Sequence, residues 1–346
     1  MNDQMTPIER KHAIEDGKEI DRIPCVPFMS EFKCVLNGIC IRDFWQDSYK
    51  MAEAEILTFN RYGHDRLVIG PNTRGITEAL GGKFVYPDDG IPYADVPYLK
   101  TYDFLNGMEP VNAFHHPRIQ VFARAAELLS EEAAEIVPIE ASIGGPFTIA
   151  ANLRGVERLL RDCRKYPEEV HKLLRIVADS QKSCIDMAAI YGLGIAMADP
   201  VANPALIGPE MYETFVYPYT KEVTEYAFEK TGHKVSLHMC GKTYRIWEYL
   251  VKYKLNEISL DNIVDLGLAA QELGESVPIA GNVDPVGVIL QGTKEEIQEA
   301  VYECIRKGEK SRKGYTLTTG CDIPETTDAE KIDYFMAAAR TYRAYK

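Results

Sequence analysis

The sequence has no long hydrophobic run and no strongly basic segment. No apolar stretch in its 346 residues approaches the 18 residues that a membrane-spanning helix requires, and the N-terminus is too polar for a secretory signal peptide. Lysine and arginine number 39 against 52 aspartate and glutamate residues, which gives a net charge of −13. No basic cluster occurs beyond the short stretch from Lys307 to Lys313. These absences argue against membrane and nucleic-acid partners.

The eight cysteines lack the close spacing of a secreted disulfide framework. They are spread from Cys25 to Cys321, so we expect thiols rather than disulfides and a reducing, cytoplasmic location. Low-complexity segments, linkers and internal repeats are absent as well. A chain of this length buries roughly three quarters of its unfolded surface, and α/β barrels of this size fold as one unit. The sequence therefore predicts a single domain over residues 1–346.

Two short stretches in the C-terminal part of the chain carry candidate metal ligands. The run VSLHMCG (235–241) alternates like a strand, which places His238 and Cys240 on one face. The run LTTGCD (317–322) places Cys321 at the end of another strand-like segment. One imidazole and two thiolates suit zinc, which binds such ligands tetrahedrally and, when catalytic, keeps a fourth position open. Chance placement of buried cysteines is the alternative interpretation.

Apolar segments alternate with helical patterns along the chain. Parallel strands that are covered on both faces read as near-continuous apolar runs, and eight such segments predict an α/β protein with a (β/α)8 TIM barrel. An N-terminal helical extension precedes the barrel. The segment near residues 71–116 is too long for a plain connection, which indicates a hairpin excursion or a substrate-covering loop. The predicted strands are residues 21–28, 66–70, 135–141, 194–200, 235–241, 257–261, 277–285 and 314–319.

Polar side chains lie at or just beyond the ends of several predicted strands. Barrel enzymes carry their chemistry at the C-terminal ends of the strands, where His238, Cys240 and Cys321 are also expected. Each of the polar residues alone is more typical of a cap or a turn, whereas several on one rim favour a shared site. They are Asp199, Asp261, Asn282 and Asp284.

Five short motifs follow one another in an order that is shared with a known family. They are GIAMADP (194–200), HMCG (238–241), SLD (259–261), GNVDP (281–285) and TGCDIP (319–324). With this order the chain resembles the uroporphyrinogen decarboxylase superfamily, and more narrowly its zinc-dependent, corrinoid-linked methyltransferase branch. The opening helix followed by Asp-Arg-Ile-Pro (21–24) is also similar to that family. The resemblance extends over nearly the whole chain, apart from residues 71–117.

The resemblance implies that His238, Cys240 and Cys321 are zinc ligands. It also implies a barrel that moves a methyl group to or from the cobalt of a corrinoid. Corrinoid proteins hold the lower ligand of cobalt with an Asp-x-His-x-x-Gly motif, which none of the seven histidines fits, so a separate corrinoid protein is the expected partner. The decarboxylases carry an Arg-Gln-Ala-Gly-Arg signature, and nothing like it follows Pro24, which disfavours tetrapyrrole decarboxylation. Association into a homodimer stays open.

Zinc could serve either direction of methyl transfer. A coordinated thiol is deprotonated and can take a methyl group from methyl-cobalt, whereas a coordinated methyl ether is activated for attack by cobalt(I). The strand-end segments are acidic, amidic or apolar, and 20 Tyr and 12 Phe could supply aromatic pocket walls. We therefore expect O-demethylation of a methoxylated aromatic. A coenzyme M-type thiol methyltransferase is the alternative, and a non-catalytic zinc barrel is a further one.

Further roles are expected for the polar residues. Glu140 could be a fourth zinc ligand or a general acid, and the equal alternative is a solvated strand end. Asp199 is the second catalytic candidate, because it could hold the imidazole of His238 or a substrate hydroxyl, and Asp284 could do the same. Substrate binding is expected from Asn203, Asp261, Asn282 and Asp284.

Overall fold

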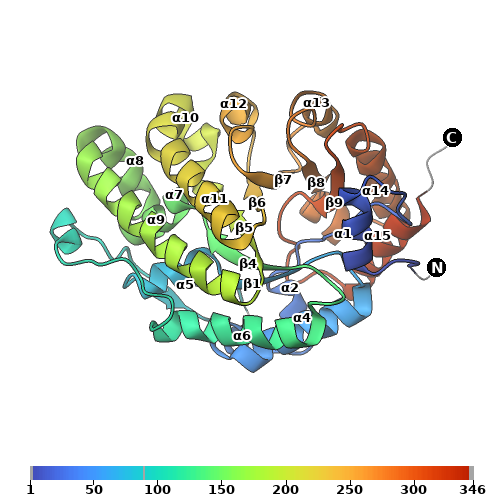
Figure 1. Cartoon of the computed structure of the whole chain (residues 1–346), viewed down its shortest axis with the longest axis horizontal. Coiled ribbons are helices and arrows are strands. Elements are labelled where there is room, and N and C mark those ends of the chain that lie inside the picture. Colours follow the sequence, from blue (N-terminus) through green and yellow to red (C-terminus); the bar gives the residue numbers. More distant parts are fainter. Residues whose placement is uncertain (1–2, 89, 343–346) are drawn as a thin grey trace. The chain divides into compact units, whose positions relative to one another are not determined.

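The computed structural model describes residues 3–88 and 90–342, and its main sheet contains seven strands. Their order is β1-β4-β5-β6-β7-β8-β9, and the pairs β4–β5, β5–β6, β7–β8 and β8–β9 are parallel. Parallel strands in sequence order that alternate with helices form the pattern of a (β/α)8 barrel, which confirms the predicted fold class (Figure 1). The strands are β1 Leu67–Pro71, β4 Ile139–Gly144, β5 Gly194–Ala198, β6 Val235–Met239, β7 Leu255–Leu260, β8 Ile279–Val283 and β9 Tyr315–Thr319.

The chain divides into two compact units. The central unit comprises Val68–Glu127 and Glu140–Asn256, and the terminal unit comprises the chain up to Leu67, Leu128–Ile139 and the chain from Glu257 onward. The helices of the central unit are α5 Asn72–Ala79, η1 Tyr102–Leu105, α7 Pro146–Arg154, α8 Val156–Lys165, α9 Pro167–Ile190, η2 Pro200–Ala202, α10 Pro204–Met211, η3 Tyr212–Val216, α11 Tyr217–Thr231, η4 Tyr244–Ile246 and α12 Trp247–Leu250. Those of the terminal unit are α1 Pro7–Glu15, α2 Phe32–Leu36, α3 Ile41–Gln46, α4 Ser48–Tyr62, α13 Leu266–Glu272, η5 Pro285–Leu290, α14 Lys294–Gly308 and α15 Ala329–Thr341, and α6 Pro117–Ala133 has residues in both units.

In the central unit, helices α9 and α11 lie side by side against strands β5 and β6 (Figure 1). The register of the two strands pairs Met197 with Leu237 and Ala198 with His238. Met197 and Leu237 are both buried. Because side chains alternate between the two faces of a strand, burial of Leu237 turns His238 to the opposite face.

The long excursion contains both a helix and a hairpin. Helix α5 follows β1 directly and was not predicted. Strands β2 (Phe84–Val85) and β3 (Tyr93–Ala94) pair antiparallel, which confirms the hairpin interpretation. The excursion then contacts the end of α7, where Leu99 donates its N–H to the carbonyl of Leu153 at 2.9 Å and Arg154 donates to two carbonyls of the excursion.

The prediction of a strand at residues 21–28 was wrong. Only Cys25 forms an isolated parallel bridge, with Leu317 of β9. Leu317 N–H donates to the carbonyl of Pro24 at 2.8 Å, and Val26 N–H donates to the carbonyl of Leu317 at 2.9 Å. Pro24 and Pro27 have no N–H to donate, so the segment runs beside β9 without a continuous ladder.

The predicted strand at 135–141 begins later than expected. The N–H groups of Ile136 and Val137 both donate to the carbonyl of Ala133, which closes a turn after α6. Strand β4 then starts at Ile139 and continues to Gly144. The boundary was misplaced because apolar residues of the turn extend the apolar run of the strand.

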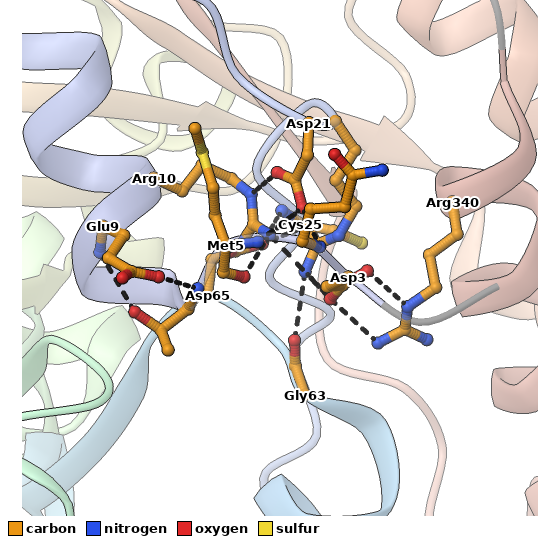
Figure 2. Close-up of polar contacts among 12 residues, drawn as sticks. Asp3, Met5, Glu9, Arg10, Asp21, Cys25, Gly63, Asp65 and Arg340 are labelled. Atoms are coloured by element: carbon orange, nitrogen blue, oxygen red, sulfur yellow. Dashed lines mark hydrogen bonds and ion pairs between the residues drawn. The ribbon is translucent and has the colours of Figure 1, made fainter.

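A buried ion network in the terminal unit joins α1 to the residues before β1 (Figure 2). Arg10 is 1% exposed, and it donates to Asp21 at 2.7 Å and to one carboxylate oxygen of Asp65. The second oxygen of Asp65 accepts from Arg22 and from the N–H of Cys25. Buried charges require partners, so the Asp-Arg-Ile-Pro opening is explained by its place in this network.

None of the described helices combines the length and the apolar character needed to cross a bilayer. No disulfide joins any of the eight cysteines, all of which lie in the described part of the chain. The cytoplasmic location stays a prediction.

Candidate metal site

Strand β6 presents the first two candidate ligands. Its alternation places His238 and Cys240 on the same face, and His238 Nε2 lies 3.3 Å from Cys240 Sγ. Both side chains are half-buried. Cys240 follows the last residue of the strand, which is where barrel enzymes place reactive groups.

The loop after β9 presents the third candidate ligand, Cys321. Gly320 donates its N–H to the carbonyl of Val283 at 2.8 Å, and Thr319 Oγ1 donates to the carbonyl of Cys321 at 2.8 Å. A Cβ at Gly320 would lie 2.4 Å from the backbone nitrogen of Asn262, so glycine is required for the close approach of this loop. These contacts hold the backbone of Cys321 in place.

The structure gathers three side chains that could hold a metal ion. One ligand atom from each of His238, Cys240 and Cys321 lies within 4.8 Å of the other two. Tetrahedral zinc with sulfur and nitrogen ligands separates neighbouring ligand atoms by about 3.6 Å. The donor set therefore fits zinc better than calcium or magnesium, which prefer oxygen. Zinc binding itself stays a prediction.

Asn203 packs against the backbone that follows Cys240. Gly241 has a φ of +81°, and a Cβ at this position would lie 1.8 Å from Asn203 Nδ2. The side chain of Asn203 also accepts a hydrogen bond from Ala205 N–H at 2.9 Å and so caps α10. The sequence proposed Asn203 as a substrate donor. The structure shows a cap that borders the site.

Asp199 is buried beside β6. Its Oδ1 accepts hydrogen bonds from the N–H of Thr148 at 2.9 Å and from Thr148 Oγ1 at 2.6 Å. Burial raises the pKa of Asp199 to about 6, although the bonds from Thr148 oppose this shift. The N–H of Asp199 donates to the carbonyl of His238 at 3.2 Å. Asp199 thus joins the end of β5 to the strand that carries His238.

Glu140 does not lie at the end of its strand, which corrects the expectation from the sequence. It is the second residue of β4, four residues before Gly144, and Gly144 pairs with Ala198 at the level of His238. Four residues of strand span about 13 Å. Glu140 Oε1 accepts a hydrogen bond at 2.8 Å from Ser236, which shares a face with His238. This position favours support of β6 over a direct role as a fourth zinc ligand.

Asn282 and Asp261 hold the end of β7 to β8. Asn282 Nδ2 donates to the carbonyl of Asp261 at 2.9 Å and to that of Val264 at 2.8 Å, which uses both of its amide hydrogens. The carboxylate of Asp261 accepts from Ile263 N–H at 3.1 Å. Asn282 therefore has no amide hydrogen left for a substrate, whereas a substrate contact by Asp261 stays a prediction.

Asp284 caps η5. Its Oδ1 accepts from the N–H groups of Val286 and Gly287, each at 2.9 Å. This is the cap role that the sequence offered as the alternative to substrate binding. Its proposed hold on His238 or on a substrate hydroxyl stays a prediction.

The sequence did not identify Gly145, Thr148 and Ser236 as site residues. A Cβ at Gly145 would lie 2.1 Å from Asp199 Cγ, so glycine is needed where α7 begins. The Gly-Gly-Pro run that begins at the last residue of β4 (144–146) was the available signal, because it marks a tight turn into a helix. The contacts of Thr148 and Ser236 depend on neighbouring strands and left no local signal.

Comparison with known proteins gives a consistent result. The family model for uroporphyrinogen decarboxylase (URO-D) matches residues 6–342. Methylcobamide:CoM methyltransferase MtbA of Methanosarcina mazei is 30% identical over 355 residues, which cover 98% of this chain and 99% of that protein. MtbA of Methanosarcina acetivorans is 27% identical over 98% of this chain and 99% of its own length. A solved structure described as a methyltransferase from Methanosarcina mazei has a TM-score of 0.85 at 21% identity, over 97% of this chain and 98% of that one.

A (β/α)8 barrel with one imidazole and two thiols gathered together defines a class of barrel enzymes with a candidate metal centre. Within that class, the chain belongs to the uroporphyrinogen decarboxylase family, in its corrinoid-linked methyltransferase branch. The family resemblance seen in the sequence is thereby confirmed, and so is the expectation of a methyltransferase.

Proposed function

We propose that this enzyme moves a methyl group from a methylated corrinoid, carried by a separate protein, to a small thiol. The supporting observation is the group of His238, Cys240 and Cys321, whose ligand atoms lie within 4.8 Å of one another. When bound there, Zn2+ would supply a Lewis acid that lowers the pKa of a substrate thiol. With three protein ligands, the fourth position is left for that thiol.

The comparisons favour a thiol over a methoxylated aromatic. The two MtbA relatives are named as methylcobamide:CoM methyltransferases. A methylated-thiol–coenzyme M methyltransferase of Methanosarcina mazei is also 25% identical over 98% of this chain. O-demethylation, which was expected from the aromatic content of the sequence, therefore gives way to the thiol alternative. The acidic character of the strand ends does not exclude a thiol, because a thiol substrate need not carry an anionic group besides its thiolate.

The proposed transfer moves a methyl group without its bonding electrons. The cobalt–carbon bond breaks and leaves its electron pair on cobalt, a sulfur–carbon bond forms, and the proton of the thiol is released. The chain orients the reacting groups: Asp199 N–H holds the carbonyl of His238, and Asn203 packs against Gly241. We assign Asp199 and Asn203 a positioning role, and we assign Glu140 support of β6 through Ser236.

The test uses zinc-loaded enzyme, methylcob(III)alamin and 2-mercaptoethanesulfonate or 2-mercaptoethanol under anaerobic conditions. The cobalt spectrum should show loss of methyl-cobalt only when both enzyme and thiol are present. Cys240→Ala and Cys321→Ala should lose the bound zinc, about one ion per chain, together with the activity. Cys40→Ala is the matched control, because Cys40 is also half-buried but lies outside the group, and it should keep both.

Two results would reverse the proposal. Methyl-cobalt that forms from cob(I)alamin and a methoxylated aromatic would restore O-demethylation as the reaction. A full zinc content without methyl transfer in either direction would favour a barrel in which the metal is structural.

A further inference from the structure

A surface pocket lies between α8 and α10 of the central unit, and we call it the α8–α10 pocket. It has a volume of about 560 Å³. Three of its lining residues are cations and three are apolar, and the exposed fraction of Leu206 is 54%. The lining residues are Leu160, Arg161, Arg164, Lys165, Leu206 and Met211.

The charge of this pocket is opposite to that of the chain. Arg161 and Arg164 are exposed and make no ion pair with any residue that the structure describes, although the chain carries a net charge of −13. The acidic residue between them, Asp162, is buried and pairs with Arg154 at 2.7 Å. Asp162 is therefore directed inward, whereas the guanidinium groups of Arg161 and Arg164 are left to bind an anion from outside.

Helix α10 joins the pocket to the candidate metal site. Its N-cap, Asn203, packs against Gly241, which directly follows Cys240. Leu206 lies three residues beyond Asn203, which corresponds to about 4.5 Å along a helix axis. A protein that brings a methyl group to Cys240 must approach this end of β6, where Asn203 begins the helix that lines the pocket.

We infer that the α8–α10 pocket docks the corrinoid-carrying protein through an acidic segment with apolar side chains. This inference rests on the proposed function. Because the chain as a whole repels acidic surfaces, a local group of cations next to the site would orient an acidic partner and increase the rate of association. Burial of Leu160, Leu206 and Met211 would add apolar contact area at the centre of the interface.

The test measures methyl transfer to 2-mercaptoethanesulfonate from two donors with the double variant Arg161→Glu/Arg164→Glu. One donor is free methylcob(III)alamin, and the other is a purified corrinoid protein with an Asp-x-His-x-x-Gly motif, loaded with methylcob(III)alamin. The double variant should lower kcat/KM about tenfold more with the protein donor than with the free donor, mainly through KM. Added salt should likewise raise the KM of the wild type for the protein donor.

The matched control is Lys234→Glu/Lys254→Glu, which makes the same change in net charge. Both lysines are exposed, precede β6 or β7, and make no ion pair with a described residue. The control should react with both donors like the wild type. Equal losses with both donors in the Arg161→Glu/Arg164→Glu variant, or no loss with the protein donor, would overturn docking at this pocket.

Two further outcomes separate the competing explanations. If millimolar inorganic phosphate at constant ionic strength inhibits the wild type with both donors but not the double variant, the pocket binds a small anion and the docking proposal is overturned. If the wild type transfers methyl from neither donor to any thiol, the proposed function itself fails, and the docking proposal fails with it.

Discussion

Gly241 allows Asn203 to pack beside the second candidate zinc ligand. An alanine at position 241 would have to keep a backbone φ of +81°, and its Cβ would lie 1.8 Å from Asn203 Nδ2. We expect Gly241→Ala to displace Asn203 and the adjacent Cys240, and thereby to weaken zinc binding by at least about tenfold. Competition with a zinc chelator measures this affinity.

Gly232→Ala provides the matched control for this prediction. Gly232 also has a left-handed backbone, with a φ of +73°, but no atom lies within 4 Å of the Cβ that alanine would add. It should lower the free energy of unfolding by about 1 kcal/mol from backbone strain and leave the zinc affinity unchanged. Equal zinc affinities for the two variants would show that the contact between Gly241 and Asn203 does not support the site.

His64 should make the folded enzyme less stable in acid. Burial, reinforced by the positive charges of Lys33 and Arg22, lowers the pKa of His64 from 6.5 to about 3. Below pH 6.5 the unfolded chain binds a proton at His64 that the folded chain does not bind. Above pH 6.5, His64 therefore does not change the free energy of unfolding with pH. As the pH falls from 6.5 towards 3, the free energy of unfolding falls by about 1.4 kcal/mol per pH unit.

Urea unfolding of the wild type and of His64→Leu between pH 8 and 4.5 isolates this effect. The two proteins share all other titrating groups, so the difference in their free energies of unfolding should change only below about pH 6.5. There the wild type should lose stability faster than the variant. A difference that stays constant over the whole range would contradict a buried, neutral His64.

At the residue scale, local patterns predicted ligands but not contacts between strands. His238 and Cys240 could be proposed because a spacing of two fixes a common face in any strand. The role of Asn282 could not be predicted, since its partners are two backbone carbonyls after the neighbouring strand. The local sequence does not distinguish a side chain that hydrogen-bonds to distant backbone groups from one that faces a substrate.

At the element scale, prolines and turns moved the boundaries of two predicted strands. Pro24 and Pro27 reduce the expected first strand to the single bridge at Cys25, although the apolar run is intact. Glu140 was predicted at the end of its strand but is the second residue of β4, because the apolar run begins in the turn before the strand. The hydrophobic pattern locates a segment in the core, whereas the hydrogen bonds that define a strand depend on its neighbours.

The ion network in front of β1 should contribute strongly to stability. Asp65 accepts hydrogen bonds from Arg10, Arg22 and the N–H of Cys25, and both arginines are buried. Asp65→Asn leaves two buried guanidinium groups without their shared counter-charge, so we expect the free energy of unfolding to fall by about 3 kcal/mol. Urea unfolding at neutral pH measures the change.

Asp333→Asn is the control for an ion pair outside the core. Asp333 binds Arg61 at 2.7 Å, and the side chains of both residues are 43% exposed. Exposed pairs are screened by water, so this substitution should change the free energy of unfolding by less than about 1 kcal/mol. Similar losses of unfolding free energy in the Asp65 and Asp333 variants would show that the buried network contributes no more to stability than an exposed ion pair.

At the scale of the whole molecule, the fold was the most predictable property. Few folds allow strands that alternate with helices to hydrogen-bond their backbone groups and to bury both faces of the sheet. The alternation in the C-terminal half was therefore sufficient to predict a barrel. The substrate and the direction of transfer could not be predicted from composition, because the count of tyrosines and phenylalanines does not show which of them line a pocket. The organisation of residues 1–346 as a single domain stays a prediction.

Zinc should stabilise the folded chain as a whole. A ligand that binds only the folded state raises the free energy of unfolding by mass action, by about 2.7 kcal/mol when free zinc exceeds its Kd a hundredfold. Removal of zinc by a chelator should therefore lower the Tm of the wild type, and added zinc should restore it. Cys321→Ala should show neither shift, because two ligands hold the ion too weakly. If zinc raises the Tm of Cys321→Ala as much as that of the wild type, the ion binds elsewhere, and Cys321 is not among its ligands.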